Sequence, residues 1–144
     1  MKSMVKRFTL VTRHETELVN ITDSVLEEVK ASGVRSGTAF VLSLHTTTGL
    51  TVNEGLPDLE QDIVDWLRLL VPEEGRTWKH ARFLHEDGQM AINAPSHLRG
   101  ALLGFEVFFP IQDGQVVKGA RQTIYFVELD GPQERTWVLQ ILGE

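Results

Sequence analysis

Apolar and polar residues alternate along several short stretches of this chain, which is the period-two pattern typical of β-strands. The clearest stretch is residues 37–45, GTAFVLSLH, where Phe40, Leu42 and Leu44 share one face of the predicted strand. Asp113-Gly114 is a strong hairpin signal, because both residues tolerate positive φ. We expect strands over residues 5–12, 17–21, 37–45, 50–54, 105–109, 122–129 and 135–142.

Three other stretches show the spacing of apolar residues that is typical of helices. One begins near Pro57, with acidic residues in its first turn, and closes at Val71-Pro72. The others are expected over residues 22–33 and 93–104, each ended by a glycine. The predicted buried stripe of the helix after Pro57 consists of Leu59, Ile63, Trp66, Leu67 and Leu70.

The predicted elements follow the order strands, helix, strands, helices, strands, which indicates an α+β fold. We expect a mostly antiparallel β-sandwich with two to three helices, forming a single domain over residues 1–144. The stretch 73–94 has no clear periodicity, and it carries Trp78, His80 and His85. A segment of that length inside a compact domain is often functional.

Composition narrows the classes of function. The chain has a net charge of −6 and no Lys/Arg cluster, which argues against a nucleic-acid surface. It has no cysteine, so disulfides, thiolate metal sites and a cysteine nucleophile are excluded. The first residues, MKSMVKRFTL, contain no apolar run long enough for a signal peptide or a membrane span. We therefore expect a cytoplasmic protein with no membrane partner.

Candidate chemistry concentrates in the stretch HTTTGLTVNEGLPDLEQD, residues 45–62. Gly49 is the predicted turn residue of a hairpin, and a bulge or an odd-length loop would place His45 beside Asn53. Asp62 falls at the edge of the apolar stripe of its helix, from where a carboxylate can face a cleft. The plain alternative is a solvated acid in the first turns of the helix.

His97 falls near the start of the helix over 93–104, where free backbone N–H groups would suit a phosphate. Each polar residue singled out also has a structural explanation, such as a strand end, a loop surface or a solvent-facing side of a sheet. The full set of candidates is His45, Asn53, Asp62, His80, His85, His97, Gln122 and Glu128.

Two kinds of chemistry remain open for this set. Neutral imidazoles together with Asp62 would suit a divalent metal with an open coordination position. Short metal motifs such as HExxH are absent from the sequence, so any such site would join distant segments. Without a metal, the same groups could bind a phosphate and shuttle protons near neutral pH.

A set of short motifs resembles the YjbQ family, described as secondary thiamine-phosphate synthases, over nearly the whole chain. The motifs are His45-Thr-Thr, Leu50-Thr-Val-Asn-Glu54, Asp62, Leu70-Val-Pro72, Trp78-Lys-His80, Asn93 to Leu98, Leu103-Gly104, Asp113-Gly114, Gly119, Gln122, Glu128, Asp130-Gly-Pro132 and Gly143-Glu144. The resemblance implies an α+β sandwich that assembles as a homotrimer, with a polar pocket near a subunit boundary.

The resemblance also implies roles for individual residues. It assigns catalysis to His45, Asp62 and His97, and a divalent metal such as Mg²⁺ or Zn²⁺ to His45, His80 and His97. The implied activity joins a hydroxymethylpyrimidine diphosphate to a thiazole phosphate and releases pyrophosphate, ordinarily with Mg²⁺. The implied substrate-binding residues are Thr46, Thr47, Asn53, Arg121 and Gln122.

The sequence departs from the family pattern at three places. It has Asn53-Glu-Gly-Leu-Pro-Asp58 where the family often has Asn-Glu-Asn followed by Asp-Pro. It has Gly119-Ala-Arg-Gln122 where the family usually has Gly-Thr-Trp-Gln, so Arg121 is either a new charge for a phosphate or a surface change. It has Pro95-Ser-His97 where many members have His-Ala-His. These departures leave three hypotheses: an enzyme acting on phosphorylated heterocycles, a metal-dependent hydrolase, and a non-catalytic trimer that binds a ligand.

Overall fold

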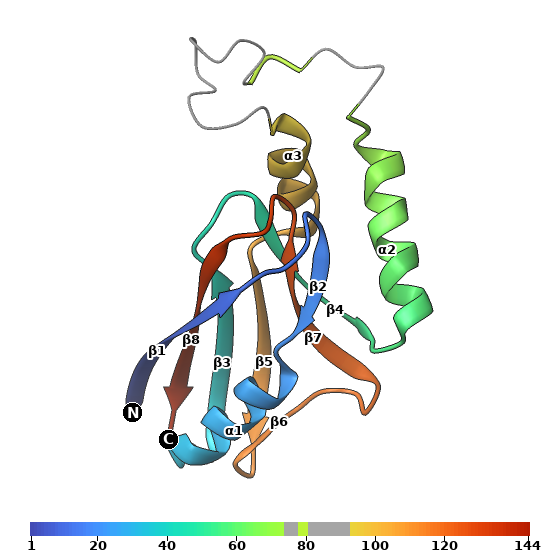
Figure 1. Cartoon of the computed structure of the whole chain (residues 1–144). Helices are drawn as coiled ribbons and strands as arrows, with labels where there is room; N and C mark the ends of the chain where they lie inside the picture. The colour runs from blue at the N-terminus through green and yellow to red at the C-terminus, as the bar shows by residue number, and fades with distance from the viewer. Residues whose placement is uncertain (74–77, 81–92) are drawn as a thin grey trace.

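The computed structural model describes residues 1–73, 78–80 and 93–144 (Figure 1). This part of the chain forms eight strands and three helices. In chain order they are β1 Lys2–Val11, β2 Glu17–Asn20, α1 Thr22–Ser32, β3 Ser36–Ser43, β4 Thr48–Glu54, α2 Pro57–Leu70, α3 Ala94–Leu103, β5 Glu106–Gln112, β6 Gln115–Val116, β7 Gln122–Glu128 and β8 Glu134–Gly143.

The strands form two sheets in which every pairing is antiparallel. One sheet has five strands in the order β1-β8-β3-β5-β6, and the other has three in the order β2-β7-β4. Helices α1 and α3 lie at opposite ends of the sheets, and α2 runs along the outside beside β4 and β7 (Figure 1). The predicted α+β sandwich, mostly antiparallel and with three helices, is confirmed.

The main core lies between the two sheets. Alternate residues of β3 and β8 point inward, among them Val41, Leu139 and Ile141, and all three are buried. Trp137 stacks on Phe8 with ring centroids 4.2 Å apart. Fully burying an apolar side chain of this size contributes about 1.5–3 kcal/mol, so these contacts hold the sheets together.

Strand β7 is buried on both faces, which explains its nearly continuous apolar sequence, TIYFVEL. One face supplies Ile124 and Phe126 to the main core. The opposite face supplies Tyr125 and Val127 to a smaller cluster beneath α2, which includes Leu67. The second cluster attaches α2 to the outside of the three-stranded sheet.

The buried face of α2 is narrower than the predicted apolar stripe. Val64 and Leu67 are buried and Ile63 is partly buried, but Trp66 is 52 % exposed and Leu70 is also exposed. The expectation that Trp66 and Leu70 belong to the core was wrong for this chain by itself. None of the helices in the part of the chain that the structure describes is long and apolar enough to cross a membrane.

The connection between β3 and β4 is not the predicted hairpin. The two strands belong to different sheets, so residues 44–47 cross from one sheet to the other. Gly49 lies inside β4 rather than in a turn. A Cβ at Gly49 would lie 2.8 Å from the Leu103 side chain of α3, so this glycine permits close packing of a helix.

Candidate functional site

His45 lies in the crossing segment 44–47, whose backbone is fixed by hydrogen bonds at both ends. The N–H of Leu44 donates to the carbonyl of Thr136 at 3.4 Å. The hydroxyls of Ser43 and Thr48 are 2.5 Å apart, and Thr48 Oγ1 also donates to the His45 carbonyl at 3.3 Å. The hydrogen bonds of Ser43, Leu44 and Thr48 thus hold the backbone of the segment that carries His45 in place.

The ring of His45 is oriented by a backbone group on β8. The N–H of Thr136 donates to Nε2 of His45 at 2.9 Å, so Nε2 is an acceptor and the neutral ring carries its proton on Nδ1. The pKa of His45 is lowered, mainly by burial and then by the charge of Arg135, with a smaller opposing effect of Glu128. His45 is therefore a neutral ring that can donate from Nδ1.

A buried ion pair lies behind His45. Glu128 is fully buried and Arg135 is 3 % exposed. Arg135 Nε donates to Glu128 Oε1 at 2.9 Å, and Nη2 donates to Oε2 at 2.6 Å. The same Nη2 donates to Thr47 Oγ1 at 2.9 Å, which connects the ion pair to the crossing segment.

The carboxylate of Glu128 has further donors around it. Thr12 Oγ1 donates to Oε1 at 2.6 Å, and the N–H groups of Leu129 and Asp130 donate to Oε2 at 3.0 and 3.2 Å. Burial by itself raises the pKa of Glu128, but the hydrogen bonds from Arg135, Thr12 and Asp130 outweigh it and lower the pKa. Glu128 is thus an ionised structural group, and its bonds leave it no part in substrate chemistry.

A second pair of polar rings lies near α3. The rings of His80 and His97 meet edge to face, with centroids 4.8 Å apart and an interplanar angle of 88°. Burial and then the charge of His80 lower the pKa of His97. Asp130 and a hydrogen bond to the Thr46 backbone oppose this effect. The bond to Thr46 joins His97 to the segment that carries His45.

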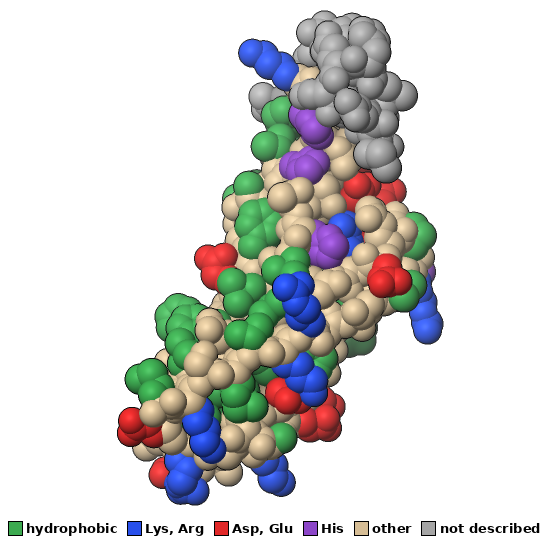
Figure 2. All heavy atoms as spheres, turned by 90° about the vertical axis from the view of Figure 1, so that its left-hand side faces the viewer, with side chains coloured by type: hydrophobic (Ala, Val, Ile, Leu, Met, Phe, Trp, Pro, Cys, Tyr) green, Lys and Arg blue, Asp and Glu red, His purple; other side chains and the backbone are tan. Residues whose placement is uncertain are grey.

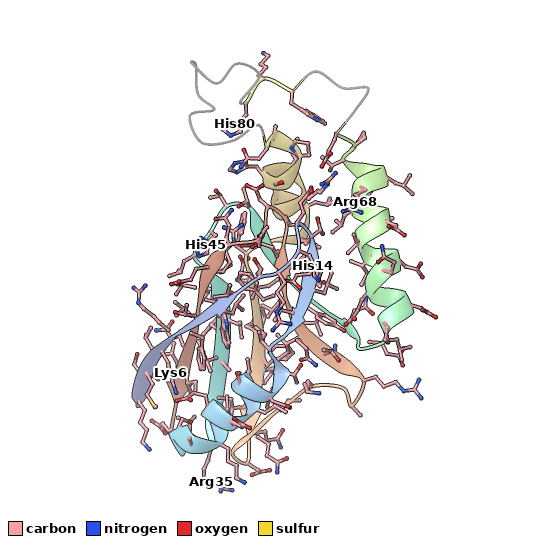
Figure 3. All side chains as sticks on the ribbon, viewed as in Figure 1. Lys6, His14, Arg35, His45, Arg68 and His80 are labelled. Carbon is pink, nitrogen blue, oxygen red and sulfur yellow. The ribbon has the colours of Figure 1, made fainter. Side chains whose placement is uncertain are left out.

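The two histidine positions lie toward the same end of the molecule. Figure 3 shows His45 and His80 on the side of α3, whereas Arg35 lies at the opposite end. Figure 2 shows the histidine side chains along one face, next to the residues that are not described. A small cavity of about 220 Å³ accompanies them, and its lining residues are Trp78, Lys79, His80, Ala94, His97 and Leu98.

The N-terminus of α3 offers less to an anion than the sequence predicted. The helix begins at Ala94 after Asn93, as expected, and ends before Gly104. However, the N–H groups of Ser96 and His97 donate to the Asn93 carbonyl at 3.0 and 3.4 Å, and Pro95 has no N–H. The expected row of free backbone donors was wrong, so an anion would have to rely on side chains here.

Comparison with known proteins assigns the chain to a family. A family model described as "UPF0047 protein YjbQ-like" matches residues 6–144. The chain belongs to the YjbQ family. A relative from Methanocaldococcus jannaschii, named only as a UPF0047 protein, is 32 % identical over 142 residues, covering 98 % of this chain and 96 % of the relative. The UPF0047 protein YugU of Bacillus subtilis is 30 % identical over 141 residues, covering 97 % and 100 % of the two chains.

Solved structures of YjbQ-like proteins have the same fold. A YjbQ-like protein of unknown function from Sulfolobus solfataricus matches with a TM-score of 0.89 and 35 % identity, covering 99 % of both chains. A hypothetical protein from Aeropyrum pernix matches with a TM-score of 0.87 and 35 % identity, covering 98 % of this chain and 99 % of the other. The names of these four proteins state no activity.

The YjbQ resemblance also implied Asn53 and Gln122 as pocket residues, but both lie at the end of β4 and β7 that is far from His45. Asn53 pairs with Thr123 on β7, whereas Thr48, near His45, pairs with Glu128. That register separates Asn53 from Thr48 by about 17 Å along the strand. Gln122 lies at the same far end of β7, where its Oε1 accepts from the Gly119 N–H.

Arg121 and Asp62 also lie away from the histidines within one chain. Arg121 precedes Gln122, and its side chain is 85 % exposed. Its Nη1 atom lies 3.5 Å from Oε1 of Glu54, with which it forms a surface ion pair. Asp62 is exposed on α2 and lines none of the cavities described. His85 lies outside the described residues. The fold thus pairs His80 with His97 and bonds His97 to Thr46, the residue after His45. His45 does not line the cavity, and Asn53, Asp62, Arg121 and Gln122 lie elsewhere in the chain.

The predicted metal ligands were tested against this geometry. Within residues 1–73, 78–80 and 93–144, no group of three or more His, Asp or Glu side chains is arranged to hold a metal ion. Nε2 of His45 already accepts a hydrogen bond from the Thr136 N–H, so this atom cannot coordinate a metal ion at the same time. The described residues do not fit the metal set His45, His80 and His97.

Sequence reasoning missed the residues that orient His45. Arg135, Thr12 and Thr136 were not singled out, because their partners are far apart in the chain: Thr12 and Glu128 are separated by 116 positions. Arg135 alternates with the apolar residues Trp137, Leu139 and Ile141 of the same strand, and this was the available signal, since a buried arginine requires an acidic partner.

Proposed function

We propose that this YjbQ-family protein binds a phosphorylated heterocyclic molecule at the His80–His97 pocket and catalyses group transfer there, as a thiamine-phosphate synthase does. The observation that carries the proposal is the edge-to-face pair of imidazoles in a cavity lined also by Trp78 and Lys79. These four side chains combine aromatic faces with cationic and proton-exchanging groups.

The lining suits a ring that carries a phosphate. The indole of Trp78 offers a flat apolar face to a heterocycle, and Lys79 offers a positive charge to a phosphate. The lining residues themselves are not acidic, and Asp130, whose charge acts on His97, is a nearby carboxylate. A volume of about 220 Å³ is small for a ligand site and suits one substituted ring, so the second heterocycle of the proposed reaction would bind outside this cavity.

His97 and His45 would differ in their roles. His97 donates one ring N–H to the Thr46 backbone and has a lowered pKa, so its second nitrogen is free to accept a proton near neutral pH. His45 presents Nδ1–H, because Nε2 accepts from Thr136. We assign proton exchange to His97, which lines the cavity. To His45, which precedes Thr46 and does not line the cavity, we assign hydrogen-bond donation to a phosphate oxygen that extends beyond it.

The proposed reaction needs charge compensation more than proton removal. A thiazole nitrogen forms a C–N bond to the pyrimidine methylene while the C–O bond to the diphosphate breaks, and pyrophosphate leaves with its electron pair. Lys79 would stabilise the charge that develops on the leaving group. Positioning Lys79 and the two rings is thus the contribution that we assign to this chain.

Genetic complementation tests this function. Wild-type protein should rescue growth of a strain that lacks thiamine-phosphate synthase on medium without thiamine, and His97→Ala and His45→Ala should not. His14→Ala serves as the matched control, because His14 lines a different cavity. Failure of the wild type to rescue, or rescue by His97→Ala equal to wild type, would overturn the proposal.

We also propose assembly as a homotrimer, in which the apolar face next to the histidines is buried. Phe40 and Phe108 pair on the outer face of β3 and β5, with ring centroids 6.2 Å apart. Phe108 is 66 % exposed, and Leu44 and Leu102 are also exposed. Figure 2 shows hydrophobic side chains gathered beside the histidines, a face that favours self-association. Light scattering would show three chains per particle, and a monomer would contradict the assembly.

A further inference from the structure

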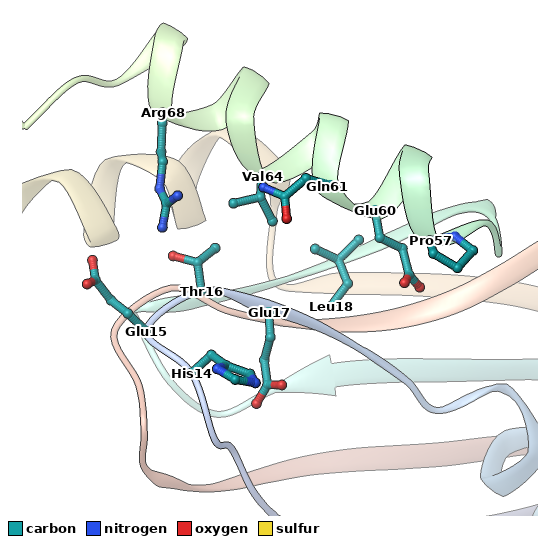
Figure 4. A pocket seen from close by; sticks show the side chains of 10 residues that line it. All are labelled: His14, Glu15, Thr16, Glu17, Leu18, Pro57, Glu60, Gln61, Val64 and Arg68. Carbon is teal, nitrogen blue, oxygen red and sulfur yellow. The ribbon is translucent and has the colours of Figure 1, made fainter.

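A separate cleft lies between the segment 14–18 and helix α2, on the outside of the three-stranded sheet (Figure 4). Its volume is about 480 Å³, which is in the range of small-molecule sites. It shares no lining residue with the His80–His97 pocket. Nothing in the proposed function uses this cleft.

One end of the cleft combines a free cation with an unsatisfied hydroxyl. Thr16 Oγ1 is the one buried side-chain polar atom without a hydrogen-bond partner in the part of the chain that is described. Arg68 is exposed and forms no hydrogen bond or ion pair within that part. Figure 4 shows Arg68 extending from α2 toward Thr16 and Glu15. A carboxylate that entered between Arg68 and Thr16 would satisfy both donors.

The other end of the cleft is acidic. Glu60 Oε2 accepts from the hydroxyl of Tyr125 at 2.6 Å. Glu17 does not belong to this end, because its Oε1 accepts from the Arg13 N–H at 2.7 Å and its side chain points away from α2 (Figure 4). Burial and the neighbouring Glu60 raise the pKa of Tyr125, so the phenol remains the donor and Glu60 the acceptor. Within the described residues, Glu60 therefore keeps its Oε1 available for a cation.

The middle of the cleft is apolar, with Leu18 and Val64 facing each other between the two charged ends (Figure 4). Glu60 and Arg68 belong to the same helix and are separated by about 12 Å along its axis. Two carboxylates, those of Glu15 and Glu60, face the cleft against the one guanidinium of Arg68, which favours a ligand with a net positive charge.

We propose that this cleft binds a basic α-amino acid such as lysine or arginine. Its carboxylate lies between Arg68 and Thr16, and its α-ammonium contacts Glu15. The methylene chain covers Leu18 and Val64, and the distal cation reaches Glu60. This binding is independent of the proposed group transfer, because the two sites share no residue.

Calorimetric titration of the whole protein tests this site with four probes. L-Lysine and L-arginine should bind saturably. Norleucine, which lacks the distal cation, and cadaverine, which lacks the carboxylate, should each bind at least about tenfold more weakly, since each loses a charge-assisted contact. Equal affinity for lysine and cadaverine, or no binding of lysine at about 10 mM, would overturn the proposal.

Two variants connect the binding to the named residues. Arg68→Gln should weaken lysine binding by about tenfold or more, whereas Arg7→Gln, an exposed arginine on β1, should not change it. Thr16→Val should weaken lysine but not cadaverine, and it should leave the thermal midpoint unchanged or higher, because it removes an unsatisfied hydroxyl. Unchanged lysine affinity in either Arg68→Gln or Thr16→Val would contradict the assignment.

Discussion

The backbone N–H of Thr136 and the Nε2 atom of His45 are 2.9 Å apart, and this contact determines what His45 can do. A backbone N–H can only donate, so Nε2 must accept, and the neutral ring carries its proton on Nδ1. His45 is consequently a fixed hydrogen-bond donor rather than a freely rotating base. Of the catalytic roles that the sequence resemblance suggested for His45, the one that remains is hydrogen-bond donation from Nδ1–H to a substrate oxygen.

The tautomer of His45 can be measured directly. Nitrogen-15 chemical shifts should show His45 as the Nδ1–H tautomer at pH 7, with Nε2 in the range of an unprotonated acceptor. His14, which is exposed and has no hydrogen bond from its ring in the described residues, provides the comparison. A protonated Nε2 on His45 would contradict the assignment.

Replacing Glu128 by Gln should be strongly destabilising. The variant leaves the guanidinium of Arg135 buried without its counter-charge, and breaking such a pair costs about 3–5 kcal/mol. Urea denaturation at pH 7 measures the change. Glu106→Gln, on an exposed position of β5, should change stability by less than about 0.5 kcal/mol. Similar effects of the two substitutions would contradict the buried network.

The lowered pKa of Glu128 also predicts a pH dependence. A carboxyl whose pKa is lower in the folded state than in the unfolded state stabilises the protein above its unfolded pKa of about 4.3. That contribution is lost as the pH falls through the folded pKa. Urea midpoints of the wild type should therefore fall below about pH 4.3, more steeply than those of Glu128→Gln. Parallel pH profiles would count against an ionised Glu128.

His97 should titrate below its ordinary pKa of about 6.5, because burial and the charge of His80 oppose protonation. The neutral ring of His97 therefore stabilises the folded state at pH values above roughly 6.5, and this stabilisation is lost as the pH falls through the pKa of His97 in the folded protein. NMR titration of the ring protons should show that His80→Ala raises the pKa of His97, whereas His14→Ala does not change the pKa of His97. A fall in the pKa of His97 in His80→Ala would contradict the paired geometry.

Gly100 should not tolerate a side chain. A Cβ at Gly100 would lie 2.7 Å from the Thr48 carbonyl and 3.3 Å from the Thr46 carbonyl, and backbone atoms cannot move aside easily. Gly100→Ala should destabilise the fold by about 1–3 kcal/mol and displace the contact between His97 and Thr46. Gly119→Ala, which meets only the flexible Gln122 side chain at 3.4 Å, is the control and should be tolerated.

Local signals predicted most of the fold. Gly33 ends α1 with φ 71°, and Asp113-Gly114 forms the β5–β6 turn with φ values of 53° and 80°. These features depend on residues close in sequence, so their chemistry is visible without the fold. Strand alternation likewise identified β3 and β8, because one face of each strand packs in the core.

The features that the sequence did not predict depend on residues that are far apart in the chain. Gly49 was interpreted as a turn residue, but it is needed for the approach of α3, which lies far along the chain. Arg135 and Thr12 meet Glu128 only because β1, β7 and β8 come together in space. Asp62 lies at the edge of the apolar stripe of its helix, as predicted, yet the orientation of α2 leaves it exposed, as in the alternative of a solvated acid. Long-range packing decided all three cases.

Binding of a phosphorylated heterocycle at the His80–His97 pocket is tested most directly by NMR titration with thiazole phosphate. We predict saturable shifts of the His80 and His97 ring protons and of the Trp78 indole, with His97→Ala abolishing the Trp78 response. Ring signals of His80 and His97 that remain unchanged at saturating ligand, or shifts confined to other residues, would contradict the proposed site.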